Sequence, residues 1–578
     1  MKKKILAFLL MGAMVLSLAS CGSASGSPSS KESTDSSGAS ESAAARTLES
    51  EPHPTKDPYE KYDPSISVTT IHTANDGAFW FPEGDSIDNN IYTRRYHDTL
   101  GVDYSFKWTC PGSQSTEKLN TMYASGDLPD VFSVNRTDFE KLQAAGSLAD
   151  MTDAIIDYAS DYTRTYLTGD YKGLLDAVTK DGKYYGIANG FSYKDGADML
   201  WLRKDWMDEL SLKEPTNLAE LETVMEAFKA KGGYSIALNA ASQQPWEWTL
   251  NNAFFEMFNS YPNIWYQNSK GEIEHGMFGA ESRENTRAAL LKAAEYYKKG
   301  YISPDFATMD FDMRNEDIFN GKCGVVFGDV WGAYWPLILH KDVDAKADWL
   351  PVGVPQATDK TAMIPRNDVQ VQNILVCRAG FEHPEALVKM TNLYHDLNNN
   401  PETMEFEDYN TNPSDSNQIF LAYPLQIYNP SFNYEGFEQI SAAQDSGKTD
   451  ELCSAYKMFY EQAQSYEKTG DKGGWPPFRS YLKEGSSLGV IDGYLKNNRI
   501  VFNEYNTEDT EFMIENAPTV KKMFDTMVID VITGAQDISA YDEFLTSWDS
   551  IYGDTATKEV NDWFQAQGGV SVQEKMSK

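Results

Sequence analysis

The sequence has few of the residues that build metal and nucleophilic sites. Its 578 residues include only seven histidines and five cysteines, and neither set shows the spacing of a zinc or haem motif. There is no His-Glu-x-x-His and no Gly-x-Gly-x-x-Gly pattern, which mark zinc proteases and dinucleotide-binding folds. We therefore predict no metal, no cofactor and no catalytic residue, and a protein that is not an enzyme.

Basic residues are also scarce relative to acidic ones. Asp and Glu total 86 against 50 Lys and Arg, for a formal net charge of −36. Nucleic acids and anionic lipid surfaces bind cationic faces, so neither is expected as a partner. The excess charge itself is typical of a solvated surface that keeps a secreted protein soluble.

Long apolar runs are missing except at the start of the chain. Lysines at positions 2–4 precede an apolar stretch from Ile5 to Leu18, as in a secretory signal. Leu18-Ala19-Ser20 then stands directly before Cys21, which resembles the bacterial lipobox, whose thiol receives a lipid after cleavage. We predict a signal peptide over residues 1–20 and a lipid on Cys21. This anchor alone would hold the protein to the cell membrane, on the extracellular side.

Composition divides the rest of the chain into a linker and a folded part. Residues 21–64 are rich in Ser, Ala, Gly, Glu and Pro, so we predict a flexible linker there. From Ser65 onward, strand-like segments such as 67–71 alternate with helical ones such as 87–100. This alternation forms two units, one that begins at residue 65 and one that begins at about Leu200. Such alternation predicts an α/β fold with mostly parallel sheets covered by helices.

Several strings resemble extracellular solute-binding protein family 1, the substrate-binding proteins of ABC transporters, and especially its long lipoprotein branch found in Firmicutes. The matching segments occur in the family's order and cover nearly all of the chain after the linker: Tyr123–Val131, Leu200–Trp206, Gly321–Trp331, Glu382–Ala386 and Ile532–Trp563.

The resemblance implies a two-lobed periplasmic-binding-protein-like fold of type II, with interleaved lobes, a hinge and a helical C-terminal region. The expected segments are lobe 1 over 65–195, lobe 2 over 196–365, a return to lobe 1 over 366–480, and a mainly helical part over 481–578 that packs on lobe 2. It also implies a monomeric receptor that delivers its ligand to the transmembrane subunits of an ABC permease.

Aromatic residues make up 13% of the chain, and several follow predicted strands, where open α/β sheets bind ligands. A flat ring suits the apolar face of a sugar, while polar side chains serve its hydroxyls. We therefore predict an oligosaccharide ligand, with these candidate binding residues: Trp80, Asp85, Asp127, Trp246, Glu247, Trp331, Trp335, Gln372, Trp475 and Arg479.

Other interpretations stay open at this stage. The ligand of the receptor could be a peptide, and a lipid-anchored glycosidase would need only two carboxylates, which 86 acids cannot identify. Asp396, Asn398, Asn400 and Glu407 have the spacing of a calcium loop, but Pro401 stands where the turn needs glycine. Cys323 and Cys377 lie in or beside apolar strand-like runs, which favours buried free thiols over a disulfide.

Overall fold

Buried apolar side chains gather in two clusters. The computed structural model describes residues 46–74, 81, 83–238, 252–410 and 419–577, which belong to a unit that starts at Arg46. The N cluster draws on segments 48–188 and 369–427. The C cluster draws on 197–364, on Met404 and Phe406, and on 434–564. Within the segment 366–480, the buried residues up to Ile427 belong mainly to the N cluster and those from Tyr434 onward to the C cluster.

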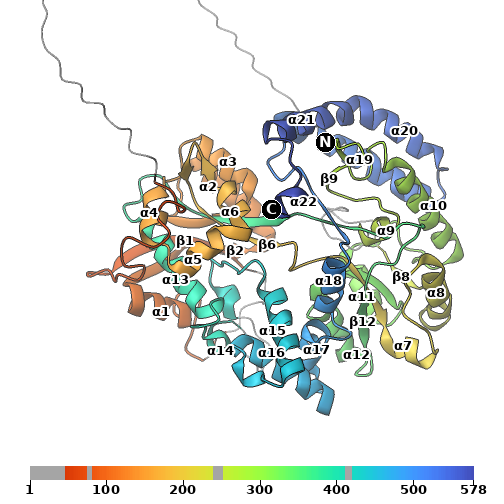
Figure 1. Ribbon diagram of the computed structural model, residues 1–578, viewed down its shortest axis with the longest axis horizontal. Coiled ribbons are helices and arrows are strands. Elements are labelled where there is room, and N and C mark those ends of the chain that lie inside the picture. Colours follow the sequence, from red (N-terminus) through yellow and green to blue (C-terminus); the bar gives the residue numbers. More distant parts are fainter. Residues whose placement is uncertain (1–45, 75–80, 82, 239–251, 411–418, 578) are drawn as a thin grey trace, which may run out of the picture. The chain divides into compact units, whose positions relative to one another are not determined.

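Two small sheets support the N cluster. Strands β1 (Ile66–Ala74) and β2 (Val102–Pro111) pair in parallel. Strand β14 (Val369–Cys377) runs antiparallel between β3 (Val131–Val134) and β6 (Ile187–Ser192). The helices of this part include α1 (Ile91–Leu100), α2 (Gly112–Ser125), α4 (Thr152–Tyr158) and α13 (Pro384–Asn398) (Figure 1).

One mixed sheet supports the C cluster, in the order β12-β7-β11-β8 (Trp349–Val352, Met199–Arg203, Val325–Gly328 and Ile236–Ala237). Strand β7 is antiparallel to both of its neighbours, and only β11 and β8 are parallel. The expectation of mostly parallel sheets is therefore wrong, because β7 and β14 each enter their sheets from the other cluster and run against their neighbours.

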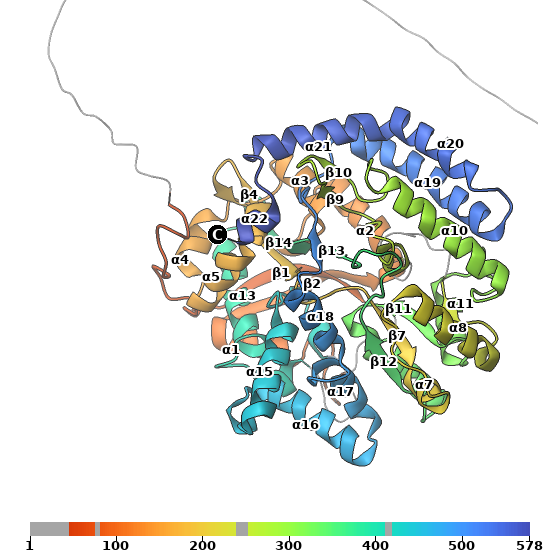
Figure 2. The ribbon, with the colours of Figure 1, turned by 45° about the vertical axis from the view of Figure 1, so that its right-hand side comes forward.

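Helices cover the C cluster in two groups. Helices α15 (Phe432–Ser446), α16 (Ser454–Thr469) and α17 (Trp475–Tyr481) lie together, and α19 (Glu511–Thr533) and α20 (Ser539–Trp548) lie along α10 (Arg283–Lys299) in both views (Figures 1 and 2). Helix α8 (Leu218–Gly232) is capped by Asn217, whose side chain accepts the Glu220 N–H at 3.1 Å. Among the described residues, no helix combines the length and the apolar character needed to cross a bilayer.

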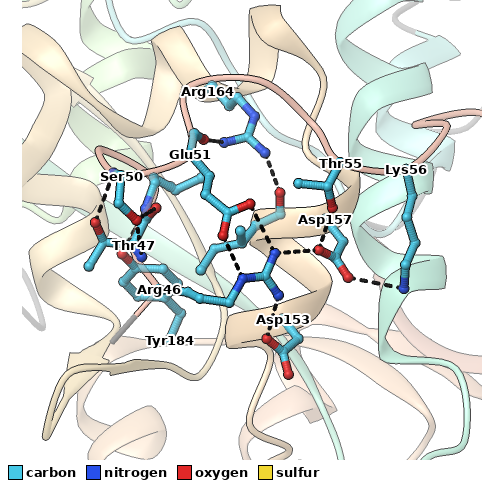
Figure 3. Close-up of polar contacts among 12 residues, drawn as sticks. Arg46, Thr47, Ser50, Glu51, Thr55, Lys56, Asp153, Asp157, Arg164 and Tyr184 are labelled. Atoms are coloured by element: carbon cyan, nitrogen blue, oxygen red, sulfur yellow. Dashed lines mark hydrogen bonds and ion pairs between the residues drawn. The ribbon is translucent and has the colours of Figure 1, made fainter. Parts of the chain in front are cut away.

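The end of the predicted linker, residues 46–62, contacts the N cluster. We call this segment the strap. Arg46 binds Asp157 at 2.6 Å and Asp153 at 2.9 Å on α4, and Leu48 is only 2% exposed (Figure 3). Further along, Tyr62 donates its backbone N–H to Leu100. The strap could not be recognised from the sequence, because residues 21–64 have the low apolar content of a linker. Ion pairs and a few apolar contacts attach it to the N cluster.

Asp157 is the centre of the strap's ion pairs, since Arg46, Thr55 and Lys56 all bind its carboxylate. We expect Asp157→Asn to lower the free energy of unfolding at neutral pH by about 1–3 kcal/mol, because it removes a charged acceptor that is largely buried. The matched control is Asp153→Asn. Its carboxylate binds the same arginine but is 81% exposed, so we expect little change.

The pH dependence gives a second measure of the same contact. Burial raises the pKa of Asp157, but hydrogen bonds from Arg46, Thr55 and Lys56 outweigh it and lower the pKa to about 2. A lowered pKa contributes stability above the ordinary value of 3.8 and loses it as the pH falls towards 2. Urea unfolding of the wild type and Asp157→Asn should therefore converge over this range. Equal decreases in the free energy of unfolding for the Asp153 and Asp157 variants would contradict this account.

Candidate functional site

Three crossings of the chain between the clusters lie next to one another. They are residues 189–196, 365–368 and 428–433, where the chain passes between the segments of the two clusters. Ser192 donates its N–H to Pro430, and its hydroxyl lies 2.6 Å from that of Ser431. Tyr193 donates its N–H to Asp368. The first crossing is thus hydrogen bonded to both of the others.

Asp195 makes the largest number of the hydrogen bonds described from the first crossing to the third crossing and the start of helix α15. Its carboxylate is 2% exposed and accepts the Tyr434 N–H at 2.7 Å and both the N–H and the side-chain amide of Asn433, the latter at 2.7 Å. It therefore caps helix α15 from a different crossing. Burial raises the pKa of Asp195 to about 7, although the hydrogen bonds from Tyr434 and Asn433 oppose this shift.

A cavity of about 400 Å³ opens beside the crossings, within the usual size range of small-molecule sites. We call it the aromatic pocket. Among the residues that the structure describes, every lining side chain is aromatic or a carboxamide. The aromatic ones are Phe191, Trp331, Tyr334, Trp335, Phe406, Phe420, Tyr428, Phe432, Phe459 and Tyr481, and the carboxamides are Gln372, Asn398, Asn399, Asn410, Asn429 and Asn433.

The end of β11 presents two tryptophans to the pocket. The strand stops at Gly328, and Trp331 and Trp335 follow on a short turn, 38% and 46% exposed. Gly332 allows the turn to pack, because a Cβ there would lie 2.6 Å from the Trp201 ring. The Trp201 indole also donates to the Asp329 carbonyl at 3.1 Å. The turn is thus fixed while its tryptophan rings stay accessible.

A polar cavity of about 320 Å³ adjoins the aromatic pocket and shares Gln372 and Tyr428 with it. Its amides are held in a chain: the Tyr428 N–H donates to Asn189 at 2.8 Å, Asn189 donates to Asn373 at 2.9 Å, and Asn373 donates to Ser133 at 2.6 Å. Because each amide is bonded on a known side, its orientation is set before any ligand arrives.

Two carboxyl groups stand behind the amides of the aromatic pocket. Asn433 donates its side-chain amide to Asp195 and accepts the Tyr481 hydroxyl, while Asn429 donates to Glu435 at 2.9 Å. Burial raises the pKa of Glu435 as well. The arrangement provides flat apolar rings and oriented neutral amides, which suits binding of a polar, uncharged molecule.

The structure brings together three of the residues that the sequence singles out, Trp331, Trp335 and Gln372. Asp127 lies elsewhere. It pairs with Lys107 in a separate groove of about 630 Å³ on α2 and β2, where Lys118 stands 5.2 Å from the Trp108 ring.

Other predicted site residues have structural roles or fall outside the description. Trp475 is fully buried and donates its indole N–H to Asp348 at 2.8 Å, and Arg479, 7% exposed, binds the same carboxylate. Both predictions are therefore corrected to core contacts. Asp85 pairs with Arg94 of α1 and is not among the described lining of the pocket. Residues Trp80, Trp246, Glu247 and Cys21 lie outside the described residues.

Sequence reasoning missed most of the lining. Phe191, Tyr428, Asn429 and Asn433 sit on the crossings, and no local pattern marks them. Tyr334 lies in the same turn as the predicted tryptophans, so the aromatic density of residues 331–335 could have indicated it.

Two local patterns prove to be structural. Gly485–Gly489 reads Gly-x-Ser-x-Gly, the pattern of serine hydrolases, but Ser487 is fully buried and donates to the Val330 carbonyl at 2.9 Å. In the possible calcium loop, Asn398 is 1% exposed and its amide bonds to Tyr92 and Tyr394. Among the described residues, no group of three or more metal-ligating side chains gathers. All four described cysteines are free, and Cys323 and Cys377 are buried as predicted.

The sequence profile of the bacterial extracellular solute-binding proteins matches residues 88–372. The match covers just under half of the chain. The matched stretch includes the crossings at 189–196 and 365–368, the turn with Trp331 and Trp335, and Gln372.

Curated relatives match shorter stretches. The polygalacturonan/rhamnogalacturonan-binding protein YtcQ of Bacillus subtilis is 27% identical over 230 residues, which is 38% of this chain and 43% of YtcQ. The fructooligosaccharide ABC transporter substrate-binding protein FusA of Streptococcus pneumoniae is 29% identical over 153 residues, 25% of this chain and 28% of FusA. The chain thus spans less than half the length of these relatives.

Solved structures match nearly the whole chain. The alginate-binding protein AlgQ2 without calcium covers 88% of this chain and 99% of its own, with 15% identity and a TM-score of 0.56. An S. pneumoniae FusA EF-hand mutant in complex with fructo-nystose covers 87% of this chain and 100% of its own, with 14% identity and a TM-score of 0.56. At this identity the likeness concerns the fold alone, and it confirms the predicted α/β periplasmic-binding-protein-like fold with a helical C-terminal region.

The role of Asp195 in the crossings can be tested by stability. We expect Asp195→Ala to lower the free energy of unfolding by about 2–4 kcal/mol, because buried N–H groups of Asn433 and Tyr434 lose their acceptor. Asp310→Ala is the matched control, since Asp310 also caps a helix but is exposed. This variant should lower the free energy of unfolding by about 1 kcal/mol. Chemical denaturation of both variants gives the comparison, and equal effects would argue against a special role for Asp195.

Proposed function

We propose that this chain is the extracellular receptor of an ABC importer and that it binds an oligosaccharide in the aromatic pocket. The lining of that pocket carries the proposal. Its rings offer apolar faces to the C–H groups of a sugar, and its amides can both donate to and accept from hydroxyls. The names of the curated relatives, which refer to polygalacturonan and fructooligosaccharide binding, support the same class of ligand.

Ligand capture would work through the two clusters, which we propose as the two lobes of the receptor. Trp331 and Trp335 come from the C cluster, whereas Gln372, which is exposed, lies on strand β14 of the N cluster. A ligand that touches all of these side chains stabilises the arrangement in which they face one another. The permease's transmembrane subunits would recognise this state. No catalytic step and no second copy of the chain is required.

Attachment to the membrane is part of the proposal. A lipid on Cys21 would leave residues 22–45 as the leash, because the strap from Arg46 onward is held against α4. This leash is shorter than the sequence suggests, yet it still allows the receptor to reach a permease in the same membrane.

Removing either tryptophan should weaken binding without unfolding the protein. We expect Trp331→Ala and Trp335→Ala each to lower oligosaccharide affinity about tenfold or more, because a stacked ring is lost. Both side chains are partly exposed, so stability should change little. Isothermal titration calorimetry on the chain from Gly22 onward measures the affinity, and Trp108→Ala, in the separate groove, should bind as the wild type does.

The same titrations separate the alternatives. Binding of short peptides and of no glycan would replace the sugar receptor with a peptide receptor, and recovery of cleaved sugar after incubation would indicate a glycosidase. Unchanged affinity in both pocket variants would place the ligand site elsewhere.

The anchor can be tested independently of the ligand. In a bacterial host with lipoprotein processing, the full chain should incorporate an alkyne fatty acid and stay with the membrane fraction. Cys21→Ser should abolish the label. Cys453→Ser is the matched control, since its thiol belongs to the folded part, and it should leave labelling unchanged. Label that persists in Cys21→Ser would rule out this attachment site.

A further inference from the structure

We infer that the oligosaccharide is uncharged and that the aromatic pocket discriminates against uronic-acid and other anionic glycans. The inference rests on the proposed function, because it defines the ligand class of the same pocket. It concerns selectivity, which the family match and the fold leave open.

The first observation is the chemistry of the lining. Among the described residues, no Asp, Glu, Lys, Arg or His lines the aromatic pocket. The internal segments outside the description, residues 75–80, 82, 239–251 and 411–418, contain no Lys, Arg or His in their sequence either. A glycan carboxylate is normally met by a guanidinium or ammonium group. Neither the described lining nor these segments can supply one.

The second observation is what lies behind the lining. The amides of Asn433 and Asn429 are backed by the carboxyl groups of Asp195 and Glu435. Both carboxyls have raised pKa values because they are buried, so negative charge is already unfavourable at this place. A carboxylate from a ligand would lose its own hydration there, and no cationic side chain of the described lining would compensate for that loss.

The chain does contain a groove with cations, and it is a different one. Lys107 and Lys118 line the groove on α2 and β2, together with Trp108. Basic residues are therefore present next to an aromatic ring elsewhere on the protein, but they do not line the pocket that collects the tryptophans. The contrast makes the neutral lining a feature of the aromatic pocket itself.

The neutral lining leads to a definite order of affinities. For glycans of equal length and linkage, an acidic form should bind at least about a hundredfold more weakly than its uncharged form, since an ionised carboxylate would be desolvated without a partner. Affinity for the uncharged form should also hardly change between low and high salt, because no ion pair contributes to it.

Matched glycans provide the test. We would titrate the chain from Gly22 onward with a panel of neutral plant and microbial oligosaccharides, with oligogalacturonides, and with the same oligogalacturonides after full methyl esterification, which removes the charge and keeps the backbone. Binding within the neutral panel, with the acids at least about a hundredfold weaker, supports the inference. Equal or tighter binding of the acidic oligogalacturonides overturns it but leaves the sugar receptor intact. Absence of binding to every glycan of the panel would overturn both.

A charge-introducing variant tests the same idea from the protein side. Gln372 lines both the aromatic pocket and the polar cavity and is exposed, so a lysine there can keep its ammonium group hydrated. Gln372→Lys should raise the ratio of acidic to neutral affinity about tenfold or more. Gln372→Met, of similar length and without charge, is the matched control and should leave the ratio unchanged. If Gln372→Lys fails to change the ratio, charge is not what the pocket selects against.

Discussion

The hydrogen bonds among the three chain crossings are the constraint on which the rest of the site depends. Ser192 and Asp195 on the first crossing bind Pro430 and Asn433 on the third, and Asp195 also binds Tyr434, the next residue of helix α15. The lining of the aromatic pocket is drawn partly from these same segments. The chain therefore cannot change how the two clusters meet without also changing the pocket, which is the coupling a binding receptor needs.

Much of the fold could be predicted from local sequence. Alternation of β-branched strands and amphipathic helices indicated α/β architecture, and Asn217 is the type of residue that starts a helix, as it does for α8. Strand direction could not be predicted, because β7 and β14 arrive from the other cluster and no local pattern records this. The strap was missed for a similar reason. Its low apolar content is that of a linker, and only the folded N cluster supplies the carboxylates that hold Arg46.

The site was predictable only where residues cluster along the chain. Trp331 and Trp335 follow a strand closely and both line the aromatic pocket. Trp475 and Arg479 follow helix α16 and no strand, and both side chains bind Asp348 in the core. Phe191, Tyr428, Asn429 and Asn433 could not be identified in advance, because each is an ordinary loop or strand residue until the crossings come together.

The most direct test of the central claim is a crystal structure of the chain with a bound oligosaccharide. The account predicts a sugar ring stacked on Trp331 or Trp335, with its hydroxyls hydrogen bonded to amides such as Asn429 and Gln372. A sugar bound instead in the groove of Lys107 and Trp108, with the aromatic pocket making no contact to it, would contradict the account.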